Sequence, residues 1–394
     1  MKQLIRQATI VFPDHVAANC DMLIADGVIS ALGANFPVDN DANSVNFSGD
    51  IMIPGLIDTH VHGAGGCDIM DGTADHLVTL RQALLREGTT AFLGTTLSSP
   101  VEQLLVVLKI LAAGRKAASQ SGQAELLGVH LEGPFLTAEY KGAHVDQFIP
   151  PSTEGGDVEV LTQLVKAYPD LIRILTFAVD RLDTTELIAF CHRHGIIPSA
   201  GHTAADYLAM THAAEAGLRR ITHAFNAMPG IHHRKPGPMT EGLLNADIEL
   251  ELIADGVHVH PAILEMAFRL KPQDKVTLVS DGTRSVGMPE GEYELGGLMT
   301  TVKSGIARLA DGTIAGSAYP LLQGIRTMVQ TLNRSLPEAV RFASLNPARS
   351  LGIAHRLGSL EPGKEATFVR LSSKLSVKQV WVKGELAVER SAGK

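Results

Sequence analysis

The sequence is poor in the features that mark secreted and membrane proteins. Its 394 residues include only three cysteines, Cys20, Cys67 and Cys191, which lie far apart and without the CxxC spacing of a zinc ribbon or a redox pair. No stretch approaches the ~20 uninterrupted apolar residues of a membrane span, and the start reaches Pro13 and Asp14 before any apolar run of signal-peptide length. We therefore expect a soluble, cytoplasmic protein with free thiols and no membrane partner.

Positive charge is also scarce. The 34 Lys and Arg residues are outnumbered by 42 Asp and Glu residues, so the formal net charge is −8, and no basic tract is present. We therefore expect no nucleic-acid partner. The chain has neither a GxxxxGK[ST] motif nor a Rossmann fingerprint, and its glycine-rich GAGG at 63–66 is more typical of a tight turn than of a nucleotide site.

Both ends of the chain have the pattern of short β-strands. Residues 1–53 alternate apolar and polar positions around the hairpin signal Asp26-Gly27, and residues 354–394 do so around Lys383-Gly384. We predict that the two ends pair into one small β-sandwich domain.

The region between them, 54–353, alternates strand-like runs with longer helical patterns, which is typical of repeated βα units around a parallel sheet. Eight runs fit strands: 51–60, 89–95, 126–132, 171–177, 196–202, 220–225, 248–255 and 275–281. Eight such units predict an α/β fold of the (β/α)₈, TIM-like barrel type, for which ~250 residues is a typical length. A doubly wound open sheet is the alternative.

Five of the eight runs supply, at or near their carboxyl ends, candidate side chains that can bind a metal or move a proton, and catalytic groups of such barrels lie at the carboxyl ends of the strands. In the first run, the period-two alternation places the two imidazoles of the HxH pair on the same side. Together the five ends supply His60, His62, Glu132, His202, His223 and Asp281.

Each of these residues also has an ordinary structural interpretation. An HxH pair arises by chance in a chain with 16 histidines, a strand-end glutamate is usually exposed, a lone histidine is more often a core residue, and Asp281 is suited to cap a helix. All five coincidences would have to occur at successive strand ends, however. Imidazole and carboxylate are ligands of Zn²⁺ and related ions, so the set predicts two adjacent metal positions if Glu132 bridges them.

Longer motifs resemble the amidohydrolase superfamily and, within it, the N-acetylglucosamine-6-phosphate deacetylase family. They run in order along nearly the whole chain: PGLIDTHVHG (54–63), GVHLEGPFL (128–136), KGAH (141–144), SAGHT (199–203), THAFNAMPG (222–230), ADGVHV (254–259), LVSDGT (278–283), AGS (315–317) and NPARSLG (346–352). The resemblance implies a metal-dependent barrel with a β-sandwich made from both chain ends. It also implies removal of acetate from N-acetylglucosamine 6-phosphate to give glucosamine 6-phosphate, in amino-sugar catabolism and cell-wall recycling.

By that resemblance, Glu132, His202 and His223 would hold the principal metal. Some members lack the histidines of the first strand and use one metal, whereas this chain keeps His60 and His62, which would hold a second. Zn²⁺ is the expected ion, with Fe²⁺, Co²⁺ or Mn²⁺ as alternatives, since nitrogen and oxygen ligands accept all of them. The sequence leaves open whether one or two ions are bound per subunit.

The resemblance also implies roles for residues near the metal. Asp281 would be the general base, and His144 would stabilise the developing oxyanion, although His144 also fits a solvated loop histidine. The phosphate would be bound by backbone N–H groups at Asn226-Ala227, by His258 and by Arg234.

In the family the matching arginine crosses to the neighbouring subunit, so the resemblance implies a homodimer in which Arg234 completes the partner's site. An ordinary solvated loop cation is the alternative for Arg234, and His232 and His233 beside it have no assignable role.

Two other functions compete with this one. The first is an amidohydrolase with another N-acyl or cyclic amide substrate, such as N-acetylgalactosamine 6-phosphate, an N-acyl amino acid or a dihydropyrimidine. The second is a non-catalytic barrel. Arg234 together with the NAMP motif favours a sugar phosphate, and a non-catalytic barrel would be expected to lose ligands or Asp281, all of which are present. The stereochemistry of the hexosamine does not follow from the sequence.

Overall fold

A parallel β-barrel forms the larger part of the molecule. The computed structural model describes residues 2–36, 43–117 and 122–390, and the barrel strands follow one another in chain order around one sheet. They are β6 (Leu56–Val61), β9 (Thr89–Thr95), β10 (Glu125–Glu132), β11 (Ile172–Phe177), β12 (Ile197–Ala200), β13 (Arg220–Ile221), β14 (Glu249–Ile253) and β15 (Val276–Val279). Each of the eight predicted runs overlaps one of these strands.

The barrel closes where its first strand meets the chain that follows its last. The N–H of Asp281 donates to the carbonyl of His60 at 2.9 Å, and the N–H of His62 donates to the carbonyl of Gly282 at 2.8 Å. The predicted (β/α)₈ architecture is therefore confirmed, and the open doubly wound sheet is wrong. Because closure uses the backbone of these residues, it also holds three of the candidate site residues side by side.

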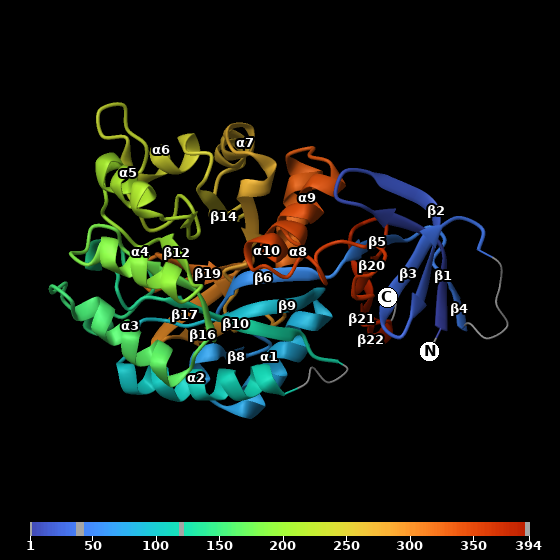
Figure 1. Cartoon of the computed structure of the whole chain (residues 1–394), viewed down its shortest axis with the longest axis horizontal. Helices are drawn as coiled ribbons and strands as arrows, with labels where there is room; N and C mark the ends of the chain where they lie inside the picture. Colours follow the sequence, from blue (N-terminus) through green and yellow to red (C-terminus); the bar gives the residue numbers. More distant parts are fainter. Residues whose placement is uncertain (1, 37–42, 118–121, 391–394) are drawn as a thin grey trace.

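Helices cover the outside of the barrel (Figure 1). In α2 the buried residues Leu104, Val107, Leu108 and Leu111 recur at helical spacing and face the sheet. The α-helices are α1 (Ala74–Arg86), α2 (Val101–Lys116), α3 (Gly156–Ala167), α4 (Thr184–Arg193), α5 (Tyr207–Ala216), α6 (Gly237–Leu244), α7 (Pro261–Leu270), α8 (Leu321–Arg326), α9 (Leu336–Phe342) and α10 (Leu345–Ser350). None of the described helices is long and apolar enough to cross a membrane.

The two ends of the chain build a second sheet, which lies beside the barrel at the right of Figure 1. Its strands are β1 (Lys2–Val11), β2 (Val16–Ala25), β3 (Val28–Gly33), β4 (Asn43–Asn46), β5 (Ile51–Pro54), β20 (Phe368–Leu371), β21 (Val377–Val382) and β22 (Glu385–Glu389). The predicted turns at Asp26-Gly27 and Lys383-Gly384 connect neighbouring strands of this sheet.

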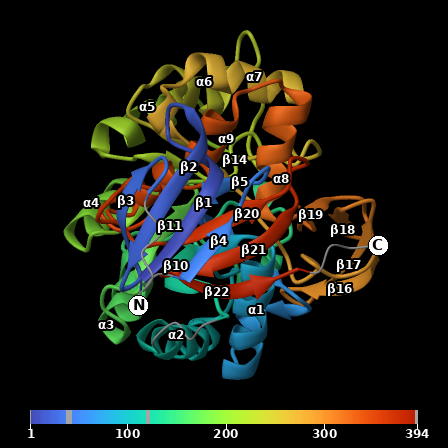
Figure 2. The same ribbon diagram turned by 90° about the vertical axis from the view of Figure 1, so that its right-hand side faces the viewer.

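Strand β5 joins the amino-terminal and carboxyl-terminal halves of this sheet, because it pairs with β1 on one side and β20 on the other. Figure 2 shows the blue and red strands side by side. The predicted pairing of the chain ends is confirmed, while the predicted domain boundaries after residues 53 and 353 stay predictions. Residues 51–60 were expected to form one strand, but β5 belongs to the terminal sheet and only β6 to the barrel.

A smaller antiparallel sheet follows the last barrel strand and was not predicted. It consists of β16 (Gly291–Leu295), β17 (Leu298–Lys303), β18 (Ile306–Arg308) and β19 (Ile314–Ser317). The N–H of Ser317, at the end of β19, donates to the carbonyl of Asp281 at 2.8 Å. This bond attaches the small sheet to the carboxyl end of the barrel. A two-residue hairpin, β7 (Gly63–Ala64) with β8 (Cys67–Asp68), follows β6.

The terminal sheet depends on an aromatic cluster that gives a test of its stability. Phe47 is fully buried, and its ring centroid lies 6.3 Å from Phe368 and 6.2 Å from Trp381. We predict that Phe47→Ala lowers the free energy of unfolding by about 3–5 kcal/mol, because it removes a buried aromatic side chain and leaves a cavity. Equilibrium unfolding in urea measures the loss. Val16→Ala, at a position 43% exposed, is the control and should change stability by at most about 0.5 kcal/mol; equal effects would contradict the prediction.

Candidate metal centre

The candidate ligands meet in one pocket at the carboxyl end of the barrel. The pocket has a volume of about 420 Å³, within the ~300–1,000 Å³ common for small-molecule sites. Its floor is made by strand-end residues that include His62, Glu132, His202, His223 and Asp281. The segment 138–144 and β19 form its walls. His60 is fully buried next to this floor.

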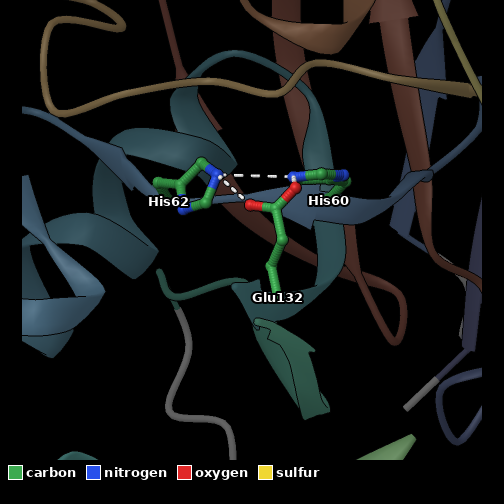
Figure 3. Close-up of side chains that lie close together, drawn as sticks. All are labelled: His60, His62 and Glu132. Carbon is green, nitrogen blue, oxygen red and sulfur yellow. Dashed lines mark hydrogen bonds and ion pairs between the residues drawn. The ribbon is translucent and has the colours of Figure 1, made fainter. Parts of the chain in front are cut away.

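Glu132 stands between two pairs of histidines. Its Oε1 lies 3.2 Å from Nε2 of His202 and 3.2 Å from Nε2 of His223. Its Oε2 lies 3.3 Å from Nε2 of His62, and Oε1 is 3.5 Å from Nε2 of His60. Figure 3 shows the carboxylate facing His60 and His62. The carboxylate is only 2% exposed, so the interpretation of Glu132 as an exposed strand end is wrong.

Asp281 completes the group on the side of the first strand. The Nε2 atoms of His60 and His62 are 3.3 Å apart, as expected from the period-two alternation. Asp281 Oδ1 lies 3.4 Å from the first and 3.3 Å from the second. Two sets of ligand atoms therefore share Glu132, which is the arrangement that the sequence predicted for two adjacent metal positions.

The donor set fits divalent cations. Ligands held about 2.0–2.2 Å from a tetrahedral ion lie roughly 3.3–3.6 Å from one another, close to most separations in this cluster. His202 Nδ1 lies 2.7 Å from the carbonyl of Tyr140, which can only accept, so its Nε2 carries the lone pair when the ring is neutral. That lone pair faces the carboxylate of Glu132 and lies 2.9 Å from His223 Nε2. An imidazole lone pair and a carboxylate that face the same space can bind a cation placed between them.

His130, in the same barrel interior, is not suited to bind a metal. Its Nδ1 lies 3.0 Å from the carbonyl of Thr59 and its Nε2 lies 2.6 Å from Thr176 Oγ1. Both ring nitrogens therefore have protein partners. Burial lowers the pKa of His130 to about 3, so this ring is neutral and structural.

Several candidate ligands stand on strained backbone. His202, His223 and Asp281 have φ of +48°, +30° and +49°, in the left-handed region that non-glycine residues rarely adopt. Each lies two residues after the end of a barrel strand, and its side chain lines the pocket. Strain of this kind costs on the order of 1–3 kcal/mol per residue and is found mostly at functional sites.

Asp281 has the electrostatic character of a base at neutral pH. Burial by itself raises the pKa of its carboxyl, but the imidazoles of His60 and His62 outweigh burial and hold the pKa well below its usual range. No described helix begins at Asp281, so the interpretation as a helix cap is wrong. Its carboxylate lies in the pocket, next to the two histidines of the first strand.

His144 is a buried donor rather than a solvated loop histidine. The backbone N–H of Ser98 donates to His144 Nδ1 at 3.0 Å, so the proton of the neutral ring sits on Nε2. Burial, the largest influence, lowers the pKa of His144 to about 4. The ring therefore stays neutral at physiological pH and offers Nε2–H toward the pocket, where Glu132 Oε2 is 3.5 Å away.

His258 has a carboxylate behind it and an unpaired nitrogen in front. Its Nδ1 donates to Asp255 Oδ2 at 2.7 Å, while its Nε2 is buried without a partner among the described residues. Burial lowers the pKa of His258, but the hydrogen bond and charge of Asp255 outweigh burial and raise it. Asn226 and Ala227 line the same pocket. The backbone N–H of Asn226 donates to the carbonyl of His223 at 3.0 Å.

Arg234 lies outside the pocket of its own chain. It is exposed on the loop between β13 and α6, and its Nη1 lies 2.6 Å from His233 Nε2. The rings of His232 and His233 lie against each other, with centroids 4.2 Å apart. Within one chain, these three residues do not join the cluster.

Sequence reasoning missed the residues that support the ligands. Asp255 lies in the motif ADGVHV and β19 contains the motif AGS, but neither was assigned a role, and Tyr140 lies just before the KGAH motif. Glu251 had a signal, because the run 248–255 places Glu249 and Glu251 on the same face of a strand that is buried in the barrel. No residue of that run was considered as a site residue.

Comparisons with known proteins agree with this geometry. A model described as "Amidohydrolase family" matches residues 51–387. The chain is 38% identical over 364 residues to the N-acetylglucosamine-6-phosphate deacetylase of Vibrio furnissii, covering 92% of this chain and 89% of that protein. It is 34% identical over 387 residues to the N-acetylgalactosamine-6-phosphate deacetylase of Escherichia coli O157:H7, covering 98% and 100%.

A solved structure is similar over almost the whole chain. It is a mutant N-acetyl-D-glucosamine-6-phosphate deacetylase from Mycobacterium smegmatis in complex with N-acetyl-D-glucosamine-6-phosphate. The TM-score is 0.90 at 31% identity, with 98% of this chain and 99% of the other covered. The whole architecture, including the terminal sheet, is therefore shared with that protein.

The two sets of ligands predict different losses of metal. His202→Ala and His223→Ala each remove a ligand beside Glu132 Oε1, and we expect each to lose the principal ion. His60→Gln combined with His62→Asn should reduce the content from two ions to one. Elemental analysis of the purified variants measures this. His192→Ala, on α4 and hydrogen-bonded to the carbonyl of Gly217, is the control. Full metal content in the His202 and His223 variants would refute the assignment.

Proposed function

Because the chain belongs to the amidohydrolase family, we propose that it removes the acetyl group of N-acetylglucosamine 6-phosphate, giving glucosamine 6-phosphate and acetate. The observation that carries this proposal is that the buried Glu132 cluster, Asp281 and the Nε2–H of His144 all face one pocket. Amide hydrolysis needs these three elements together. The relatives at 38% identity and the neighbour in complex with this sugar phosphate support the choice of substrate.

Glu132, His202 and His223 would hold the principal metal, and His60 and His62 would hold a second beside Asp281. The chemistry that a divalent cation would supply there is activation of water and polarisation of the acetamide carbonyl. Zn²⁺ is the ion that we assign, with Fe²⁺, Co²⁺ and Mn²⁺ as alternatives, because the ligand atoms are imidazole nitrogens and carboxylate oxygens.

The protein's own groups move the protons. Asp281, ionised at neutral pH, takes a proton from the attacking water and returns it to the departing nitrogen, since an amine leaves only when it is protonated. His144, neutral and protonated on Nε2, donates a hydrogen bond to the oxyanion that develops on the carbonyl oxygen.

Phosphate recognition uses His258 and the turn after β13. The Nε2 of His258 is buried and unpaired among the described residues, and Asp255 favours the charged form of its ring, so it suits an anion. In the turn, the N–H of Asn226 is already bonded to the carbonyl of His223, so Asn226 shapes the turn and Ala227 supplies the backbone donor.

Arg234 is assigned to the pocket of a partner subunit. Ile231 in the loop that carries it is 49% exposed, and the following helix α6 and its neighbour α5 carry the exposed side chains of Leu244 (66%) and Leu208 (62%). A second copy of the chain that covered these residues would bury apolar surface. It would also carry Arg234 toward the other subunit, so we propose a homodimer with shared sites.

The experiment that tests the function is acetate release by protein of known metal content. N-acetylglucosamine 6-phosphate should be hydrolysed much faster than unphosphorylated N-acetylglucosamine. N-acetylgalactosamine 6-phosphate is assayed alongside, because a relative of 34% identity is named for that substrate. A faster reaction with the galacto sugar would reverse the assignment of the hexosamine, and no acetate from either phosphate would refute the function.

Asp281→Asn tests the proton transfer. Removing a positioned general base typically costs about 10²–10⁴-fold in rate, so turnover should fall by this factor. Binding of the substrate should persist, measured by calorimetry with the phosphorylated sugar. Ser285→Ala, a buried hydroxyl nearby that bonds to Thr283, is the matched control and should retain turnover. An Asp281→Asn variant within threefold of the parent would exclude the role.

Arg234→Ala tests the shared site. Loss of a charge-assisted phosphate contact should cost about 1.5–3 kcal/mol, or on the order of 10- to 150-fold, against the phosphorylated substrate only. Arg269→Ala, a mostly exposed arginine on α7, is the control. Mixing Asp281→Asn with Arg234→Ala chains should restore activity, because a heterodimer has one site with both native residues. If mass measurements verify that the subunits have exchanged and activity does not return, Arg234 does not contribute to the partner's site.

A further inference from the structure

A column of buried polar side chains runs through the barrel interior to the candidate metal centre. At its base, Arg220 on β13 donates from Nη2 to Ser350 Oγ at 2.7 Å. Its Nη1 donates to Glu251 Oε1 on β14 at 2.9 Å. The other oxygen of the carboxylate, Oε2, lies 3.3 Å from His60 Nδ1. The side chains of Arg220, Glu251 and His60 are all fully buried.

Packing alone does not account for this column. Removing an arginine and a glutamate from water is costly, and apolar residues of similar volume often stabilise a core as well or better. The inside of a (β/α)₈ barrel is ordinarily filled by branched apolar side chains. The buried ion pair of Arg220 and Glu251 in the barrel interior therefore indicates a role in positioning a neighbouring side chain.

The contact with His60 defines which of its nitrogens carries the proton. Glu251 Oε1 accepts from Nη1 of Arg220 at 2.9 Å, and a carboxylate paired with an arginine in this way is ionised, so it can only accept. Nδ1 of His60 is therefore the donor, and when the ring is neutral its Nε2 carries the lone pair, on the side of Glu132 and Asp281. Carboxylates behind metal-binding histidines fix the ring and increase its basicity in this way.

His62 shows the contrast. It belongs to the same HxH pair and its Nε2 faces the same carboxylates, but its Nδ1 has no hydrogen-bond partner among the described residues. The column therefore supports one histidine of the pair and not the other.

We propose that Glu251, held by Arg220, is a positioning residue that fixes the tautomer and orientation of His60 and thereby sets the affinity of the second metal position. This inference rests on the proposed metal-dependent function. It assigns Glu251 no contact with substrate and no part in proton transfer.

Glu249 provides a matched control on the same strand. It also accepts from Arg220, at 2.7 Å, but its other bonds are to Ser350 and Thr277 rather than to His60. Glu249→Gln therefore perturbs the same arginine without touching the ligand. In Glu251→Gln, Arg220 still has the carboxylate of Glu249 as a partner. The remaining ion pair favours folding of that variant.

The experiment titrates metal-free protein with Zn²⁺ and follows both binding steps by calorimetry. Glu251→Gln should weaken one of the two steps by roughly 10- to 100-fold and leave the other unchanged. Glu249→Gln should bind like the parent. In a His60→Gln background, Glu251→Gln should have no further effect, because its action passes through that ring. Glu251→Asp keeps the charge near Arg220 but withdraws it from His60, and replaces Glu251→Gln if the latter does not fold.

Nitrogen-15 NMR of the histidine rings in metal-free protein, at a pH at which the His60 ring is neutral, gives an independent readout. His60 should be protonated on Nδ1 in the parent and in Glu249→Gln, and should lose this preference in Glu251→Gln. Equal weakening of both steps, an effect that persists without His60, or a parent that binds one ion would overturn the proposal. The titration needs no substrate, so a parent that releases no acetate would refute the proposed function while the Glu251 comparison still decides the positioning role.

Discussion

One buried carboxylate, surrounded by imidazoles, is the constraint on which the rest of the structure depends. Glu132 has five histidine nitrogens within 3.5 Å of its oxygens, from His60, His62, His144, His202 and His223. No single helix or hairpin can present so many rings to one group. A closed parallel barrel can, because the carboxyl ends of all its strands meet at one rim.

The same constraint explains where the backbone is strained and how it is held. His202, His223 and Asp281 adopt left-handed conformations that ordinary packing would not select. The backbone around them compensates: the N–H of Asp281 bonds to the carbonyl of His60, and its carbonyl accepts from Ser317 on β19. The small sheet β16–β19 thus does more than form a pocket wall, since its last strand fixes the turn that carries the proposed base.

Sequence reasoning found the barrel and its rim because both are local patterns. Apolar runs alternating with helical stretches identify the strands, and a polar residue at the end of such a run is visible without knowing the fold. Contacts between distant segments have no such mark. Glu251 was passed over because a glutamate inside a run resembles an exposed position until closure of the barrel buries it. Residues 51–60 form one run, and only the pairing of β5 with β1 and β20 shows that it serves two sheets.

The two proposed metal positions share one feature of their histidine ligands. Each combines one histidine whose Nδ1 is held with one whose Nδ1 has no partner among the described residues: His202 with His223, and His60 with His62. The holding groups differ, however. His202 is held by the neutral carbonyl of Tyr140, which lies in the same segment as His144, so the loop that carries the proposed oxyanion donor also orients a principal ligand. His60 is held by an ionised carboxylate from the barrel interior. The first position is therefore tied to the substrate side of the pocket, and the second to the rigid core.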